Sequence, residues 1–170
     1  IGHIGVNKSG TLCHCGNRGC LEIFAGGPAI AERALEAAQA GQSPTLLDHY
    51  EKNGKALRAE DVGEAAREGD ALALEVIRES GQMVGDVLAG LVNFYNPEMI
   101  VIGGGVMNLG NLLLSSIRQA VLNRSTALAP RDLHIVFSET GADSGVIGAV
   151  NLAMDYMFSL SAAGNGSEGD

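Results

Sequence analysis

Tryptophan is absent from this chain of 170 residues, and aromatic residues make up only 4% of it, so we expect an aliphatic core. Basic residues are also scarce: 11 lysines and arginines stand against 20 acidic residues, giving a formal net charge of −9. Proteins that grip nucleic acid need clustered positive charge. We therefore expect no direct DNA binding by this chain. No apolar run reaches membrane-spanning length and no signal peptide is visible, which favours a cytoplasmic protein without a membrane partner.

The chain does not begin with Met, and its first residue falls inside an expected strand at 1–7. We therefore expect a piece of a longer protein. Its length and its 46% hydrophobic content suffice for one domain with a core, which we place at residues 1–158. Residues 159–170 are small, polar and acidic, and we expect them to form a disordered tail.

All three cysteines lie within one short stretch between His3 and Glu22, at Cys13, Cys15 and Cys20. A Cys-x-Cys-x4-Cys loop with a His ten residues upstream is a metal-ligand pattern, because structural zinc takes four nitrogen or sulfur ligands. Glycines in the same stretch let the chain turn tightly enough for the sulfur atoms to converge. The sequence therefore predicts a metal site made of His3 and the three cysteines.

Two plainer interpretations of this stretch stay open. The cysteines could form one disulfide and leave a spare thiol, although the odd number of cysteines fits this poorly and nothing in the sequence suggests a secreted chain. His3 could be an ordinary core histidine. His14 is a poorer ligand candidate than His3, because it is wedged between two cysteines whose side chains must already point inward.

The hydrophobic pattern predicts an α/β fold. We expect strands at 1–7, 99–102 and 133–137, and helices at 27–40, 45–52, 60–68, 71–95, 109–123 and 145–158. The continuous apolar run at 99–102 is typical of a buried parallel strand. Asp70 is a good N-cap for the longest helix, and Asn96-Pro97 should end it. His49 is expected to be a solvated loop residue.

Apolar stripes are expected on two of these helices. On the longest helix the stripe would contain Leu74, Ile77, Gly81, Val84, Leu88, Leu91 and Tyr95, and it suggests self-association. On the last helix the inward residues would be Val146, Val150, Ala153, Met154 and Met157.

Three stretches resemble motifs of the ROK family, which comprises repressors, uncharacterised reading frames and sugar kinases. The most specific is GH-x9-CHCGNRGCLE at residues 2–22, and NPEMIVIGGGV at 96–106 and ETGADSGVIGAV at 139–150 extend the resemblance to about residue 158. The resemblance implies the C-terminal lobe of an actin-like (RNase H-like) ATPase fold with a zinc-binding loop. It also implies a homodimer.

The resemblance gives roles to individual residues. It implies that His3, Cys13, Cys15 and Cys20 hold a structural zinc, and that the second ring nitrogen of His3 and the carboxylate of Glu22 contact a sugar. An acid in the first turn of a helix, with no ligand, is the alternative for Glu22. The resemblance further implies that Gly103, Gly104 and Gly105 border the adenine and ribose of ATP. A tight turn is their alternative.

Two functions follow from the resemblance. The first is the sugar-sensing half of a transcriptional regulator similar to a xylose repressor, which would bind DNA only through a preceding winged helix-turn-helix. The second is half of an ATP-dependent hexose kinase similar to a glucokinase. The catalytic Asp and the phosphate loop of such kinases would lie before Ile1, so this chain offers no catalytic residue. The run IVIGGGV is kinase-like, whereas AGG at 25–27 and LAGLVNFYNP at 88–97 favour the regulator.

Overall fold

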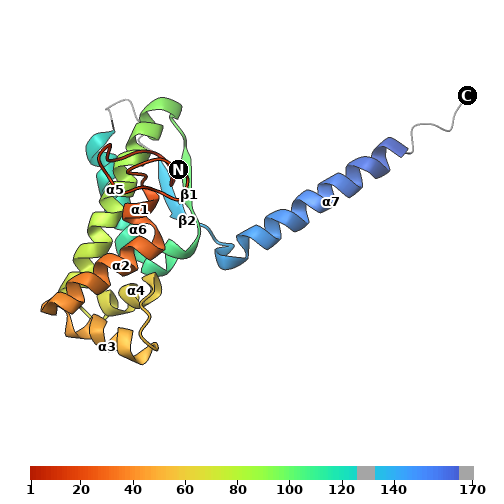
Figure 1. Ribbon diagram of the computed structural model, residues 1–170. Coiled ribbons are helices and arrows are strands. Elements are labelled where there is room, and N and C mark those ends of the chain that lie inside the picture. The colour runs from red at the N-terminus through yellow and green to blue at the C-terminus, as the bar shows by residue number, and fades with distance from the viewer. Residues whose placement is uncertain (126–132, 165–170) are drawn as a thin grey trace, which may run out of the picture. The chain divides into compact units, whose positions relative to one another are not determined.

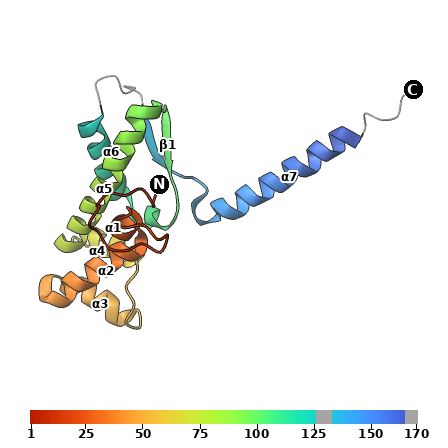
Figure 2. The ribbon, with the colours of Figure 1, turned by 45° about the horizontal axis from the view of Figure 1, so that its top comes forward.

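The computed structural model describes residues 1–125 and 133–164, and the chain divides into two units, Ile1–Phe137 and Ser138–Asp170. The first unit contains α1 (Glu22–Ala25), α2 (Gly27–Ala37), the π-helical turn η1 (Ala38–Gln42), α3 (Pro44–Lys52), α4 (Ala59–Arg67), α5 (Ala71–Tyr95), β1 (Met99–Ile102), the 3-10 helix η2 (Gly105–Leu109), α6 (Asn111–Arg124) and β2 (His134–Phe137). Figures 1 and 2 place α2, α3 and α4 near the start of α5, and the two strands toward its end.

Helix α5 has the bounds that the sequence predicts, because both of its ends are marked by local chemistry. The side chain of Asp70 accepts a hydrogen bond from the backbone N–H of Ala73 at 2.8 Å, as an N-cap should. At the other end Asn96 adopts the left-handed conformation, with φ of 47°, directly before Pro97. The predicted cap and the predicted stop are both confirmed.

Helix α6 packs along α5 at two glycines. A Cβ atom on Gly81 would lie 2.6 Å from Cβ of Ser116, and one on Gly85 would lie 2.5 Å from Cβ of Ala120. The glycines therefore allow a close helix–helix approach that larger residues would prevent. Ile77 and Leu88 of the predicted stripe are buried in the same core. This stripe is thus used inside the chain, whereas Tyr95 at its end is 70% exposed.

The two strands pair in parallel, with Met99 opposite His134 and Ile102 opposite Phe137. The predicted burial of the first strand is only half right. Ile100 and Ile102 pack on the core, but Met99 and Val101 are 57% and 56% exposed. Successive side chains of a strand point to opposite faces, and within the described chain the core covers one face only.

The N-terminal segment forms no regular strand, contrary to the prediction for residues 1–7. Isolated antiparallel bridges join Gly5 to Cys20 and Leu12 to Arg18 instead. The segment is held by the loop that follows it, because the backbone N–H of Val6 donates to the carbonyl of Gly19 at 2.8 Å.

The second unit contains the 3-10 turn η3 (Gly141–Asp143) and the helix α7 (Ser144–Gly164). The helix continues past its predicted end, so residues 159–164 are helical where we expected disorder, and 165–170 lie outside the described residues. The five side chains expected to point inward are all exposed. In the part of the chain that the structure describes, no helix is both long and apolar enough to cross a membrane.

Candidate functional site

The cysteine loop is shaped by glycines at two points of close contact. Gly19 has φ of +66°, and the carbonyl of Asn7 occupies the place where a side chain on Gly19 would lie. A Cβ on Gly10 would lie 2.7 Å from Cα of Gly19. Only glycine fits positions like these. The backbone N–H of Gly19 then donates to the carbonyl of Thr11 at 3.0 Å, which closes the loop.

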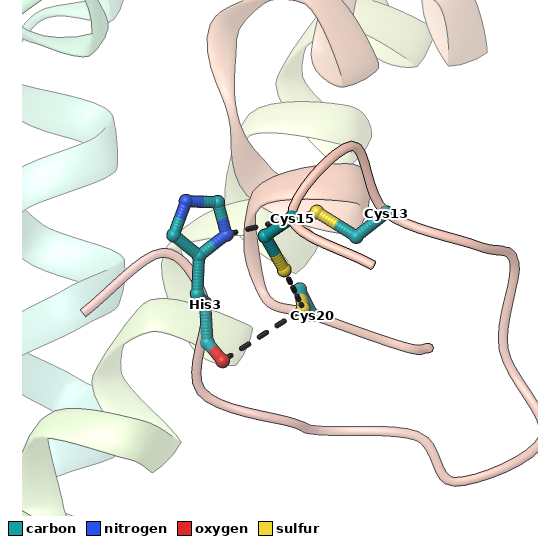
Figure 3. A group of neighbouring side chains, drawn as sticks. All are labelled: His3, Cys13, Cys15 and Cys20. Atoms are coloured by element: carbon teal, nitrogen blue, oxygen red, sulfur yellow. Dashed lines mark hydrogen bonds between the residues drawn. The ribbon is translucent and has the colours of Figure 1, made fainter. Parts of the chain in front are cut away.

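The loop gathers the four predicted metal ligands. One ligand atom from each of His3, Cys13, Cys15 and Cys20 lies within 4.8 Å of all the others. Nδ1 of His3 lies 3.6 Å from Sγ of Cys13, and Sγ of Cys15 lies 3.6 Å from Sγ of Cys20. Figure 3 shows the second ring nitrogen of His3 pointing away from the three sulfur atoms. The side chains are therefore already arranged as a group that could hold one metal ion.

These separations match a zinc tetrahedron. Zinc lies about 2.3 Å from sulfur, so two sulfur ligands of one tetrahedron are about 3.8 Å apart. Burial raises the pKa of the Cys20 thiol to about 12, whereas the backbone N–H of Asn17 lowers the pKa of the Cys15 thiol. A cation held between them would displace their protons, because metals bind thiolates. All three cysteines are free thiols in this structure.

Glu22 begins α1 directly after the cysteine loop. Its backbone N–H donates to the carbonyl of Gly2 at 2.8 Å. The carboxylate lies between two glycines: Oε2 occupies the space beside Gly2, and a Cβ on Gly26 would lie 2.8 Å from Oε1. Sequence reasoning missed these two glycines, whose only signal is their place on either side of the acid. The residue is exposed, so the carboxylate is open to a ligand.

Glu22 also lines a cleft of about 930 Å³ in the first unit. Gly103, Gly104 and Gly105 line the same cleft, and its walls include the apolar side chains of Leu88, Leu91, Tyr95, Met99 and Val101. Two sets of residues that lie about eighty positions apart in the sequence therefore meet at one cavity. His3 is not part of the cleft lining, although its neighbours Ile1 and Gly2 are.

Two of the glycines after β1, Gly104 and Gly105, differ in whether their backbone conformation requires glycine. Gly104 has φ of +87°, so its backbone favours glycine. Gly105 has no positive φ, and no described atom lies within 4 Å of the place where its Cβ would be. A turn therefore explains Gly104. It does not explain Gly105, which leaves room for a ligand to approach the backbone there.

A second group of metal-ligand types, His49, Asp61 and Glu64, joins α3 to α4. Asp61 caps α4, since its Oδ2 accepts a hydrogen bond from the backbone N–H of Arg58 at 2.7 Å. Nε2 of His49 lies 3.6 Å from Oε2 of Glu68. His49 is thus a helical residue with a side chain only 16% exposed, and not the solvated loop residue we expected. These contacts give Asp61 and His49 structural roles in joining α3 and α4 to their neighbours.

Comparison with known proteins identifies the family of this chain. The model of the ROK family matches residues 1–156. The chain belongs to the ROK family. A glucokinase of Halalkalibacterium halodurans is 39% identical over 87% of this chain and 45% of its own length. The DNA-binding transcriptional dual regulator NagC of Escherichia coli is 36% identical over 86% of this chain and 34% of its own length.

The solved structures that resemble this chain also include both ROK kinases and ROK regulators. A ROK glucokinase from Streptomyces griseus, in complex with glucose and AMPPNP, matches with a TM-score of 0.79 and 31% identity, covering 89% of this chain and 49% of that one. A ROK transcriptional regulator homologous to Escherichia coli MLC matches with a TM-score of 0.69 and 37% identity, covering 80% and 33%. The chain thus spans between a third and a half of these relatives. The predicted family and α/β class are confirmed.

Proposed function

We propose that this chain is the sugar-sensing half of a ROK transcriptional regulator. The observation that carries the proposal is the place of Glu22, which joins the cysteine loop to the cleft. A carboxylate offers several lone pairs and forms strong hydrogen bonds with hydroxyl groups. A sugar in the cleft would therefore find a strong hydrogen-bond acceptor directly beside the cysteine loop.

The cysteine loop is proposed to hold one zinc ion with a structural role. His3, Cys13, Cys15 and Cys20 would fill all four positions of the tetrahedron, which leaves no open position for a reactive water. When bound, zinc would supply folding energy to the loop. Because Nδ1 of His3 faces Cys13, its Nε2 stays available for a hydrogen bond to a sugar hydroxyl that extends beyond the residues lining the cleft.

A kinase is the second candidate, and Gly105 favours it. The cleft that Glu22 lines also contains 103–105, so a sugar and a nucleotide could occupy one cavity. In that case the chain would be the C-terminal lobe of an actin-like ATPase, and ATP would be its second ligand. The catalytic base would belong to another part of the protein.

Calorimetric titration and turnover of the full-length protein separate the two candidates. A regulator should bind a sugar from a panel of hexoses and pentoses, change its affinity for DNA on binding, and form no sugar phosphate. Transfer of phosphate from ATP to the sugar would establish the kinase instead. Failure to bind any sugar of the panel would contradict both.

Gly105→Ala tests the nucleotide role directly. The added methyl group meets no described atom, so stability should change little. If AMPPNP binds along this backbone, the methyl group should weaken its binding about tenfold or more while sugar binding stays. Unchanged AMPPNP binding in a parent that binds AMPPNP would exclude this contact.

A homodimer also stays a prediction. The helix stripe that suggested it is used within the chain, where Gly81 and Gly85 receive α6. Tyr95 at the end of the stripe is exposed and stays available for self-association.

A further inference from the structure

His14 touches two of the four ligands in the cysteine loop without being one of them. Its Nδ1 lies 3.8 Å from Sγ of Cys13, a distance within reach of an N–H to sulfur hydrogen bond. Its ring also meets the ring of His3 edge to face, with centroids 5.1 Å apart and an angle of 80° between the planes. One exposed side chain thus contacts both a sulfur ligand and the nitrogen ligand.

We propose that His14 is a positioning residue of the metal centre. In this role the Nδ1–H group of His14 donates a hydrogen bond to the thiolate sulfur of Cys13. The edge-to-face contact holds the ring of His3 so that its Nδ1 faces the same sulfur. The inference rests on the proposed zinc centre.

The negative charge of the proposed zinc centre is the reason why a hydrogen bond from His14 would stabilise it. Three thiolates and one neutral imidazole around Zn²⁺ leave a net charge of about −1. N–H donors to the sulfur atoms stabilise that excess charge and fix the ligand rotamers, and removing such an outer partner typically costs about 10–100-fold in metal affinity.

The alternative is that His14 replaces His3 as the fourth ligand. The arrangement favours His3, because a ring nitrogen of His3 lies within 4.8 Å of all three sulfur atoms, whereas His14 does not belong to this group of mutually close ligand atoms. A nitrogen ligand supplied by His14 would overturn the proposal, and the cobalt spectrum described below detects it.

Three variants of the full-length protein separate the two contacts of His14. His14→Phe keeps a ring but removes the N–H donor, His14→Asn keeps a donor but removes the ring, and Lys8→Gln is an exposed loop control. We expect zinc transfer to a chromophoric chelator to be about tenfold or more faster in His14→Phe. His14→Asn should recover part of the loss, and Lys8→Gln should match the parent.

Cobalt substitution gives a readout that loop stability alone would not move. In His14→Phe the sulfur-to-cobalt charge-transfer band should shift to longer wavelength, because a thiolate without its hydrogen bond donates electrons more readily. The ligand-field bands should keep their tetrahedral pattern, since no ligand is lost. Loss of the nitrogen ligand in His14→Phe would overturn the role of His14. The role would also be overturned if His14→Phe released zinc at the rate of the loaded parent and kept the parent's charge-transfer band. A parent that binds neither metal would overturn the zinc centre and this inference with it.

Discussion

Glu22 can reach the cleft because the residues on either side of its carboxylate have no side chains. Gly2 and Gly26 both leave room for the carboxylate oxygens, and a methyl group at either position would take that room away. The sequence identifies Glu22 through its place after the last cysteine. It does not identify the two glycines, because their role depends on a contact that only the folded chain makes.

Gly26→Ala should therefore weaken sugar binding without touching the sugar. Gly26 has φ of −72°, which alanine can adopt, but the new Cβ would lie 2.5 Å from the backbone carbonyl oxygen of Glu22 and 2.8 Å from its Oε1. We expect the carboxylate to move and the sugar affinity to fall about tenfold, the effect of losing one charged hydrogen bond. Calorimetric titration measures it.

Gly27→Ala is the matched control at the next position. Its Cβ would lie 3.7 Å from Cβ of Ala59, which is an ordinary contact. Sugar affinity should stay at the parent value. Equal losses in both variants would show that the effect comes from the helix start and not from Glu22.

At the scale of elements, α5 and α6 form the main helix pair of the first unit. Two glycines of α5, Gly85 and Gly90, differ in the space that the packing leaves for a side chain. Gly85 faces α6 at a distance that admits no Cβ, whereas no described atom lies within 4 Å of a Cβ on Gly90. The helix pattern alone gives both residues the same propensity cost. Only the packing of α6 distinguishes them.

Gly85→Ala should destabilise the protein, because the new Cβ would lie 2.5 Å from Cβ of Ala120. Overpacking of this kind costs about 1–3 kcal/mol. Gly90→Ala should stabilise the protein by up to about 1 kcal/mol, since alanine is the better helix former. Chemical denaturation of both variants measures the free energies of unfolding. A stabilised Gly85→Ala would contradict the packing.

The cysteine loop is the element whose chemistry the sequence predicts best. Cysteine spacing limits which side chains can converge, and the structure brings together the predicted four. We expect one zinc per chain in the purified protein. Cys15→Ala should leave three ligands and bind zinc at least about tenfold more weakly, because a structural site needs all four.

Mass spectrometry of metal content measures the zinc, and Lys8→Gln, an exposed loop variant, is the control. Amide hydrogen exchange at Gly19, whose N–H donates to Thr11, should accelerate in Cys15→Ala only. A parent with clearly less than one zinc per chain would refute the metal centre.

For the molecule as a whole, the sequence predicts the helices and strands better than it predicts which residues pack against them. Helix α5 was predictable because Asp70 and Asn96-Pro97 mark its ends locally. The exposure of Met99 and Val101, and of the apolar side chains of α7 between Val146 and Phe158, was not predictable, since an apolar pattern shows that a face is apolar but not what covers it. The cleft was hidden for the same reason: Glu22 and 103–105 meet only through the packing of α1, α5 and β1.

The most direct test of the account is calorimetric titration of the full-length protein and its Glu22→Gln variant with the sugar that the parent binds. Gln keeps the shape of the side chain but replaces the charged acceptor with a neutral amide. Because hydrogen bonds to charged groups contribute about 1.5–3 kcal/mol, affinity should fall roughly tenfold or more. Zinc content should stay unchanged, since Glu22 is outside the ligand group.

Glu32→Gln, an exposed acid on α2, is the matched control and should bind the sugar like the parent. The account predicts a loss of sugar affinity in Glu22→Gln alone, with one zinc per chain in all three proteins. A Glu22→Gln variant that binds the sugar as tightly as the parent would contradict it, and would leave Glu22 as no more than an acid at the start of a helix.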